Sequence, residues 1–283
     1  MRAATVSREQ LVQGIHGLPP LPHTMMRVWQ VIDNPVSNAS TLAEAVCADP
    51  SLVASLLKLA NSASYGRSRS ITTIPEAITL LGFNTIKKMC MGTIVRVGLL
   101  SQGAAPRTFD HVLYWRHCVG AGLAAEALAE IQWLPIGDLA FSHGLLHDIG
   151  MVALDRCLPD QAAEQLALQM ASDRRLMEVE REVVGMDHAE AGAALAGAWN
   201  FPVSLQEVIE HHAAPRLERG YELEALVALA CTLTDQQEYC LDRDVGGSFE
   251  RLRTFLGLSS PQISQARQVV MNRLVALAEA FDI

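Results

Sequence analysis

The sequence predicts an all-α protein, and three observations carry that prediction. Apolar residues recur at helical spacing along most of the chain, as in Leu52, Leu56 and Leu59. Strand-like alternation bounded by turn residues is not evident. Aromatic residues make up only 5% of the chain while Ala and Leu are plentiful, which is typical of helices that pack closely. The 283 residues suffice for one large domain or two small ones.

Helix start and stop signals divide the first part of the chain. Thr41, with Glu44 three residues on, forms a capping-box pattern. Asp49 is placed to cap a helix that has Pro50 in its first position. Asn61 ends this apolar helix, so we expect its amide to turn inward and to hydrogen-bond the backbone of a neighbouring segment.

Two further helices follow, and then a linker. The segment 74–82 has a proline in its first turn and stops at Gly82, a residue suited to the end of a helix. Asn84 is expected to cap the next helix. Residues 101–107, SQGAAPR, are the best candidate for a linker.

The remainder of the chain also has the pattern of helices. A long helix carries His117, and Gly137 opens another that carries His143 and His147 and is expected to end at Gly150. Three further helices are expected near 160–172, from Asp187 to just before Pro202, and from Pro202 to His211 and His212. Three more are expected from 222 through Asp235, at 248–256 and at 261–281.

Charge and composition exclude several classes of protein. The net charge is −9, whereas a protein that neutralises many phosphates carries a basic surface, so general nucleic-acid binding is disfavoured. The six cysteines form no C-x-x-C pair, which is typical of reduced thiols. We find no signal-peptide pattern at the start and no apolar run of about 18 residues, so we expect a cytoplasmic protein that does not enter a membrane.

Seven imidazole and carboxylate side chains fall on five expected helical segments or at their ends. These groups are the expected ligands of transition metals such as iron, manganese, zinc or nickel. The seven are His117, His147, Asp148, His188, His211, His212 and Asp235. Each alone has an ordinary explanation as a hydrogen-bonded core residue or a helix cap, and sequence spacing cannot show that they converge. We do not expect His143, one turn before His147, to be a ligand.

The order of these residues resembles a known pattern. His117, then His147 with Asp148, then Asp235 is similar to the H…HD…D pattern of the HD metal-dependent phosphohydrolase superfamily. The additional histidines His188, His211 and His212 resemble those of the HD-GYP branch, which hydrolyses cyclic di-GMP at a centre of two or three metals.

The N-terminal half resembles a narrower family, the HD-related output domain or HDOD. The segments that carry the likeness are 18–35, 49–66 and 74–82, which include Asp49, Pro50 and Asn61. The resemblance implies an HD-domain-like helical bundle with an N-terminal helical subdomain at 1–105 and an HD-like half with the metal site at 106–283. It also implies a bacterial signalling module whose partners are receiver or cyclic-di-GMP-related proteins, and we expect its input to arrive in trans or through the remainder of a larger protein.

Three positions depart from the hydrolytic relatives. Leu113 stands where enzymes with a third metal carry an acid, so we expect two ions at most. Met151 stands where the pattern H-D-x-G-K has a lysine that would contact phosphate. Gly220 and Tyr221 lack the proline and the loop of the GYP motif.

These departures favour a signalling module that acts through protein contacts, with a metal site in its HD-like half and without efficient catalysis. The alternative is a metal-dependent phosphohydrolase or phosphodiesterase acting on a nucleotide or a cyclic nucleotide, in which metal-bound hydroxide would attack phosphorus. Two other interpretations, a di-iron oxygenase and a helical scaffold with relic histidines, have less support in the sequence.

Overall fold

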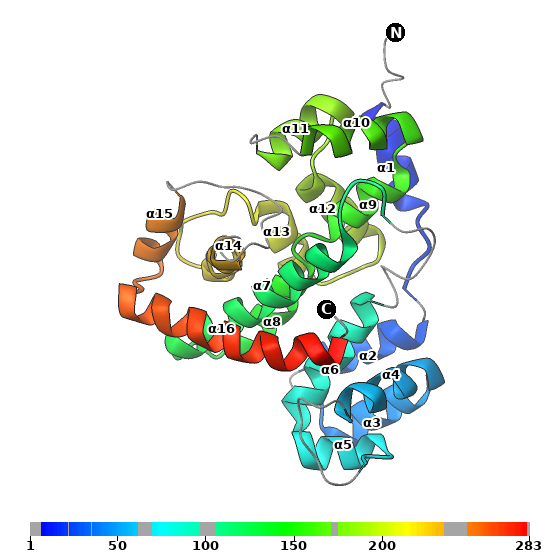
Figure 1. The fold of residues 1–283 in the computed structure, drawn as a ribbon, viewed down its shortest axis with the longest axis vertical. Helices are drawn as coiled ribbons and strands as arrows, with labels where there is room; N and C mark the ends of the chain where they lie inside the picture. The colour runs from blue at the N-terminus through cyan, green and yellow to red at the C-terminus, as the bar shows by residue number, and fades with distance from the viewer. Residues whose placement is uncertain are drawn as a thin grey trace. The chain divides into compact units, whose positions relative to one another are not determined.

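The computed structural model describes residues 7–21, 23–34, 36–61, 70–96, 106–170, 175–234 and 248–281. Within these ranges the regular structure is helical and no strand occurs, so the predicted all-α class is confirmed (Figure 1). None of the described helices combines the length and the apolar character needed to cross a membrane.

The helices form two compact units, which are described separately. The smaller unit contains the end of α16 (Ser260–Phe281) together with α2 (His23–Asp33), α3 (Ala39–Cys47), α4 (Pro50–Ala60), α5 (Ile74–Leu81) and α6 (Phe83–Val95). The larger unit contains the start of α16 and two groups of helices. Its first group is α1 (Arg8–His16), α7 (His111–Ile131), α8 (Gly137–Leu146), α9 (Ile149–Cys157) and α10 (Asp160–Met170). Its second group is α11 (Leu176–Val184), α12 (His188–Ala198), α13 (Val203–His211), α14 (Glu222–Thr234) and α15 (Ser248–Phe255).

Helix α1 belongs with the larger unit, whereas the sequence placed it in an N-terminal subdomain ending at residue 105. The reason is its apolar face, on which Leu11 and Ile15 are fully buried. This face packs against α9 and α12. Gly14 supports the contact, because a Cβ there would lie 3.3 Å from Sγ of Cys157.

Capping in the smaller unit follows the sequence in part. Asp49 caps α4 by accepting the backbone N–H groups of the first turn, and Pro50 opens that helix. The cap of α3 is Asn38, not Thr41, which lies three residues into the helix and completes the capping box from there. Between α5 and α6, Gly82 with φ 88° serves both helix ends, so Asn84 lies inside α6 and does not cap it.

Asn61 links the end of α4 to the segment that precedes α5. Its side-chain Nδ2 donates to the carbonyl oxygens of Leu57 and Ile71, both at 2.8 Å, and its Oδ1 accepts the backbone N–H of Ile71 at 2.7 Å. The expected hydrogen bonds to a neighbouring backbone are therefore present. The residue itself is exposed, so the expectation that its amide turns into the interior was wrong.

Small residues bring the central helices of the larger unit close together. Helix α7 runs along α8 and also packs on α14 (Figure 1). A Cβ on Gly144 of α8 would lie 2.8 Å from the carbonyl oxygen of Ala121, and one on Gly122 of α7 would lie 2.9 Å from that of Phe141. Since these distances exclude a side chain, glycine at both positions allows the backbones to approach.

The helix that carries His147 does not continue to Gly150, as the sequence suggested. Helix α8 ends at Leu146 and α9 begins at Ile149, so His147 and Asp148 occupy the junction between two helices. Gly150 lies in the first turn of α9 and packs directly on α12, because a Cβ there would overlap the backbone carbonyl of His188. The glycine permits a close helix crossing and does not end a helix.

Candidate metal centre

Five helices of the larger unit deliver polar side chains to one buried point. Helix α7 supplies His117, the junction of α8 and α9 supplies His147 and Asp148, α12 supplies His188, and the end of α13 supplies His212. All five side chains are at most 5% exposed. The junction explains how two adjacent residues reach the same point, because neither has to follow the 100° turn of a continuous helix.

Asp148 lies at the centre of this cluster and divides it into two halves. Its Oδ2 is 3.3 Å from Nε2 of His117 and 3.2 Å from Nε2 of His147. Its Oδ1 is 3.6 Å from Nε2 of His188 and 3.2 Å from Nε2 of His212. Each carboxylate oxygen therefore faces a different pair of imidazoles, as a bridging ligand would.

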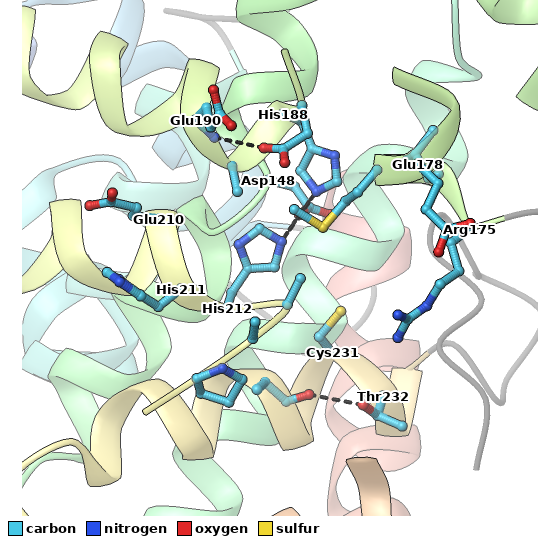
Figure 2. Close-up of a pocket in the computed structure, with 18 of the residues that line it drawn as sticks. Asp148, Arg175, Glu178, His188, Glu190, Glu210, His211, His212, Cys231 and Thr232 are labelled. Atoms are coloured by element: carbon cyan, nitrogen blue, oxygen red, sulfur yellow. Dashed lines mark hydrogen bonds and ion pairs between the residues drawn. The ribbon is translucent and has the colours of Figure 1, made fainter. Parts of the chain in front are cut away.

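The imidazoles of each pair also face each other through their Nε2 atoms. These atoms are 3.1 Å apart in His117 and His147, and 3.2 Å apart in His188 and His212. Figure 2 shows the second pair with the two ring nitrogens directed at one another. Such a contact is favourable only if a proton or a cation lies between the two nitrogens.

The opposite ring nitrogens identify which of these atoms carry hydrogen. Nδ1 of His147 lies 2.7 Å from the carbonyl oxygen of Gly144, and Nδ1 of His212 lies 2.8 Å from that of Ile209. Since a carbonyl can only accept, both Nδ1 atoms are the protonated ones in the neutral rings. The Nε2 atoms of both residues therefore present lone pairs to the centre.

The other two histidines are oriented in the same way. Nδ1 of His188 donates to the carboxylate of Glu180 at 2.7 Å. Nδ1 of His117 lies 3.4 Å from the hydroxyl of Thr234, which itself donates to the carbonyl of Cys231 at 2.7 Å and is thus free to accept. Outer partners of this kind fix the tautomer and direction of metal-binding histidines.

The imidazoles around Asp148 determine the pKa of its carboxyl group. Burial alone would raise this pKa, but the electrostatic effect of the neighbouring imidazoles, that of His147 foremost, holds it well below its ordinary value. Burial lowers the pKa of His147, against the opposing effect of Asp148. A carboxylate surrounded by four inward-directed lone pairs is a donor set that suits divalent transition metals.

One of the predicted ligands is not part of this cluster, and the position of a second is not described. His211 is half-buried, its Nδ1 pairs with the carbonyl oxygen of Glu207 at 2.9 Å, and its ring points away from the His188–His212 pair (Figure 2). Asp235 lies outside the described residues. His143, which was not expected to be a ligand, pairs instead with the carbonyl of Leu139 at 2.8 Å and the hydroxyl of Ser204 at 3.2 Å.

Three residues of the site were missed in the sequence. Cys231 of α14 places its Sγ 3.6 Å from Nε2 of His117. Its position one turn before Asp235 was the available signal. Glu180 and Thr234 orient His188 and His117, and neither stands at a spacing that would have linked it to a histidine.

A cavity of about 340 Å³ opens beside the centre. Its lining includes Asp148, His188, His212 and Cys231 from the centre itself, and also Arg175, which precedes α11, and Arg181 within that helix. Figure 2 shows Arg175 across the cavity from the two histidines. Arg181 forms an ion pair with the buried carboxylate of Asp187. The centre is thus reached from outside through a cavity that carries positive as well as negative side chains.

Comparisons with known proteins agree on one family. The HDOD domain model matches residues 18–215. A protein of uncharacterised function from Treponema pallidum is 28% identical over 214 residues, which cover 74% of this chain and 40% of that protein. The chain therefore spans less than half the length of this relative.

Solved structures show the same fold. An HDOD domain protein of unknown function from Geobacter sulfurreducens superposes with a TM-score of 0.79 at 20% identity, covering 98% of this chain and 100% of that one. A protein from Shewanella amazonensis, named as a candidate phosphohydrolase, superposes with a TM-score of 0.70 at 24% identity, covering 94% and 98%. At these identities the likeness concerns the fold alone.

Proposed function

Because this chain belongs to the HDOD family, we propose that it is a signalling module whose larger unit binds transition-metal ions around Asp148 and whose output is a protein contact. Up to two ions would be held. His117, His147 and one carboxylate oxygen would bind the first, and His188, His212 and the other oxygen would bind the second. The partners would be signalling proteins of the receiver or cyclic-di-GMP-related kind, acting in trans.

The observation that carries the metal proposal is the convergence of buried donor atoms. Neighbouring Nε2 and carboxylate oxygen atoms of the centre lie 3.1–3.6 Å apart, and the opposite ring nitrogens of His147 and His212 face carbonyl oxygens outside it. Imidazole nitrogen and carboxylate oxygen form a donor set that suits divalent transition metals. Cations between these atoms would be bound by the converging lone pairs.

Elemental analysis of protein purified without an affinity tag tests this proposal. We expect up to two equivalents of iron, manganese, zinc or nickel per chain, and a loss of metal in His147→Ala and in Asp148→Ala. Asp148→Ala should remove both ions, because both oxygens are used. His143→Ala is the matched control, since that residue lies one turn away and contacts only neutral groups. Metal-free protein after growth and dialysis with each of these metals would refute the proposal.

Two places in the sequence favour a signalling module that does not catalyse hydrolysis efficiently. Met151 stands where hydrolytic relatives carry a lysine, and its side chain is buried in α9. It cannot donate a hydrogen bond to a phosphate, and removal of one such donor costs roughly 10²–10³ in rate in other enzymes. The turn at Gly220 and Tyr221 also lacks the substrate loop of the cyclic-di-GMP enzymes.

The cavity keeps phosphohydrolysis as a second candidate function. Arg175 and Arg181 line it together with the carboxylate and imidazoles of the centre, and guanidinium groups are suited to binding phosphate. Bound ions would supply Lewis-acid polarisation of a phosphoryl oxygen. Turnover of cyclic di-GMP by manganese- or iron-loaded protein, compared with the His147→Ala, Asp148→Ala double variant, separates the two functions. We expect equal, negligible rates.

A further inference from the structure

We propose that the thiolate of Cys231 is a ligand of the ion on the His117 side, which gives that ion a mixed nitrogen, oxygen and sulfur environment. The inference rests on the proposed metal centre and goes beyond it by assigning a fourth ligand. It also distinguishes the two halves, because the sulfur contact that the structure gives is made to His117, at 3.6 Å.

Geometry is the first argument. Seen from Nε2 of His117, the neighbouring donor atoms lie at 3.1 Å in His147, 3.3 Å in Asp148 and 3.6 Å in Cys231. A tetrahedral zinc ion with 2.0–2.1 Å bonds to nitrogen and oxygen and 2.3 Å to sulfur separates its ligands by about 3.3 Å, or about 3.6 Å where one is sulfur. The longest of the three observed separations is the one that ends on sulfur, as this geometry requires.

The second argument is the convergence of donors around this atom. Sγ of Cys231, Nε2 of His117 and Nε2 of His147 all lie within 4.8 Å of one another. Cys231 is half-buried and also lines the cavity. The thiol is therefore placed to join the two imidazoles and to be reached from outside by an ion or a reagent.

The position of Cys231 on α14 is fixed by its neighbours. Thr234, one turn further along the helix, donates its hydroxyl to the carbonyl of Cys231 at 2.7 Å and faces Nδ1 of His117 at 3.4 Å. One turn of α14 thus places the hydroxyl of Thr234 beside Nδ1 of His117 and the sulfur of Cys231 beside its Nε2. Asp235, which was also expected in this half, lies outside the described residues, and among the described ones Cys231 lies there.

A sulfur ligand changes which metal is preferred. Thiolates favour softer ions such as zinc, whereas manganese favours oxygen ligands. We therefore expect the His117 side to bind zinc and cobalt well and manganese poorly. In Cys231→Ser, affinity for zinc at this half should fall by at least about 100-fold, more than the 10–100-fold that loss of an outer partner causes.

Cobalt(II) absorption provides the test, because a thiolate ligand adds a sulfur-to-cobalt charge-transfer band. Cobalt is titrated into the metal-free protein, into Cys231→Ser, and into one control, Cys47→Ser at an exposed cysteine of the smaller unit. We expect the band in the wild type and in the control. We expect its absence in Cys231→Ser, which should still bind cobalt at the His188 side.

The outcomes separate the two proposals. Cobalt binding without the band in wild type, or a band that persists in Cys231→Ser, overturns the assignment of Cys231 and leaves the metal centre standing. Failure of any cobalt, zinc, iron or manganese to bind overturns both. If Cys231→Ser does not fold, wild-type protein is alkylated with and without zinc. Protection of Cys231 but not of Cys47, read by mass spectrometry, supports the assignment, and equal labelling of Cys231 in both samples overturns it.

Discussion

A single oxygen of Glu180 accepts two hydrogen bonds from His188: one from its ring Nδ1 at 2.7 Å and one from its backbone N–H at 2.9 Å. Glu180 lies in α11 and is 2% exposed, and His188 is the first residue of α12. The carboxylate thus holds both the ring and the start of the helix. This fixes the direction in which Nε2 faces Asp148.

Replacement of Glu180 by glutamine should weaken metal binding at the His188 side by about 10–100-fold, because the outer partner of a ligating histidine loses its charge. The fold should persist, since glutamine retains an acceptor for the backbone N–H. Chelator competition measures the affinity. Glu182→Gln, on an exposed position of the same helix, should leave it unchanged. Equal affinities in the two variants would show that Glu180 has no such role.

Close packing of α9 on α12 makes Gly150 sensitive to substitution. In Gly150→Ala the new Cβ would overlap the carbonyl of His188, so the helices must separate. Overpacking of this kind costs about 1–3 kcal/mol, and the shift would also displace His188 from Asp148. We expect a lower midpoint in chemical denaturation together with weaker metal binding.

Gly197→Ala is the matched control for this substitution. Gly197 also lies in α12, but a Cβ there would meet only the side-chain oxygen of Gln206 at 3.6 Å, an ordinary contact. Alanine is preferred to glycine inside a helix by roughly 0.5–1 kcal/mol, so this variant should be slightly more stable than wild type. A Gly150→Ala protein as stable as Gly197→Ala would contradict the close approach that we describe.

Asn61→Ala should lower the free energy of unfolding of the smaller unit by roughly 1–3 kcal/mol, since it removes partners from the backbone of Leu57 and Ile71. Asn34→Ala is the control, because that exposed side chain makes a single bond, to the backbone of Val36 at 3.1 Å. Urea unfolding followed by circular dichroism measures both. An unchanged midpoint in Asn61→Ala would rule out a stabilising role for these bonds.

The sequence was sufficient to predict the helical class, because apolar spacing and capping residues act over a few residues. Asp49 caps the helix that follows it, as expected from its place before the apolar pattern, and Asp187 caps the helix that was expected to begin there. Local signals failed where two helix ends compete for one residue. Gly82 is both the last cap of α5 and the first cap of α6, so Asn84, which was expected to cap α6, lies inside it. A pattern that considers one helix at a time does not predict this sharing.

The candidate site could be predicted only in part, for a physical reason. His117, His147, His188 and His212 meet because glycines at 122, 144 and 150 allow helix backbones to touch, and this contact depends on distant partners. The sequence therefore named these histidines without showing that they converge. His211 was named on equal grounds, but its neighbour His212 takes the inward direction at the end of α13. The residues next to Glu180 and Cys231 in the sequence give no sign that the first orients His188 or that the second lies beside His117.

The last prediction concerns the pH dependence of stability and uses His143, which is buried outside the centre. Burial lowers its pKa from 6.5 to about 4, against a smaller raising effect from the carbonyl of Leu139. Its hydrogen-bond partners Leu139, Ser142 and Ser204 are neutral. Between pH 6.5 and pH 4 the unfolded chain therefore binds a proton that the folded protein does not. Stability from this residue is present in full above pH 6.5 and is lost as the pH falls toward 4.

At about 1.4 kcal/mol per pH unit, the depressed pKa of His143 corresponds to a loss of roughly 3 kcal/mol across this range. Urea unfolding at pH 7 and at pH 4, with a chelator present so that metal release does not contribute, measures the total loss. His143→Gln cannot take up the proton, so its loss should be smaller than that of wild type by roughly 2–3 kcal/mol. His16→Gln, at an exposed histidine, should behave like wild type. If His143→Gln and wild type lose equal stability, the buried imidazole is protonated at little cost and its environment is more polar than the described contacts indicate.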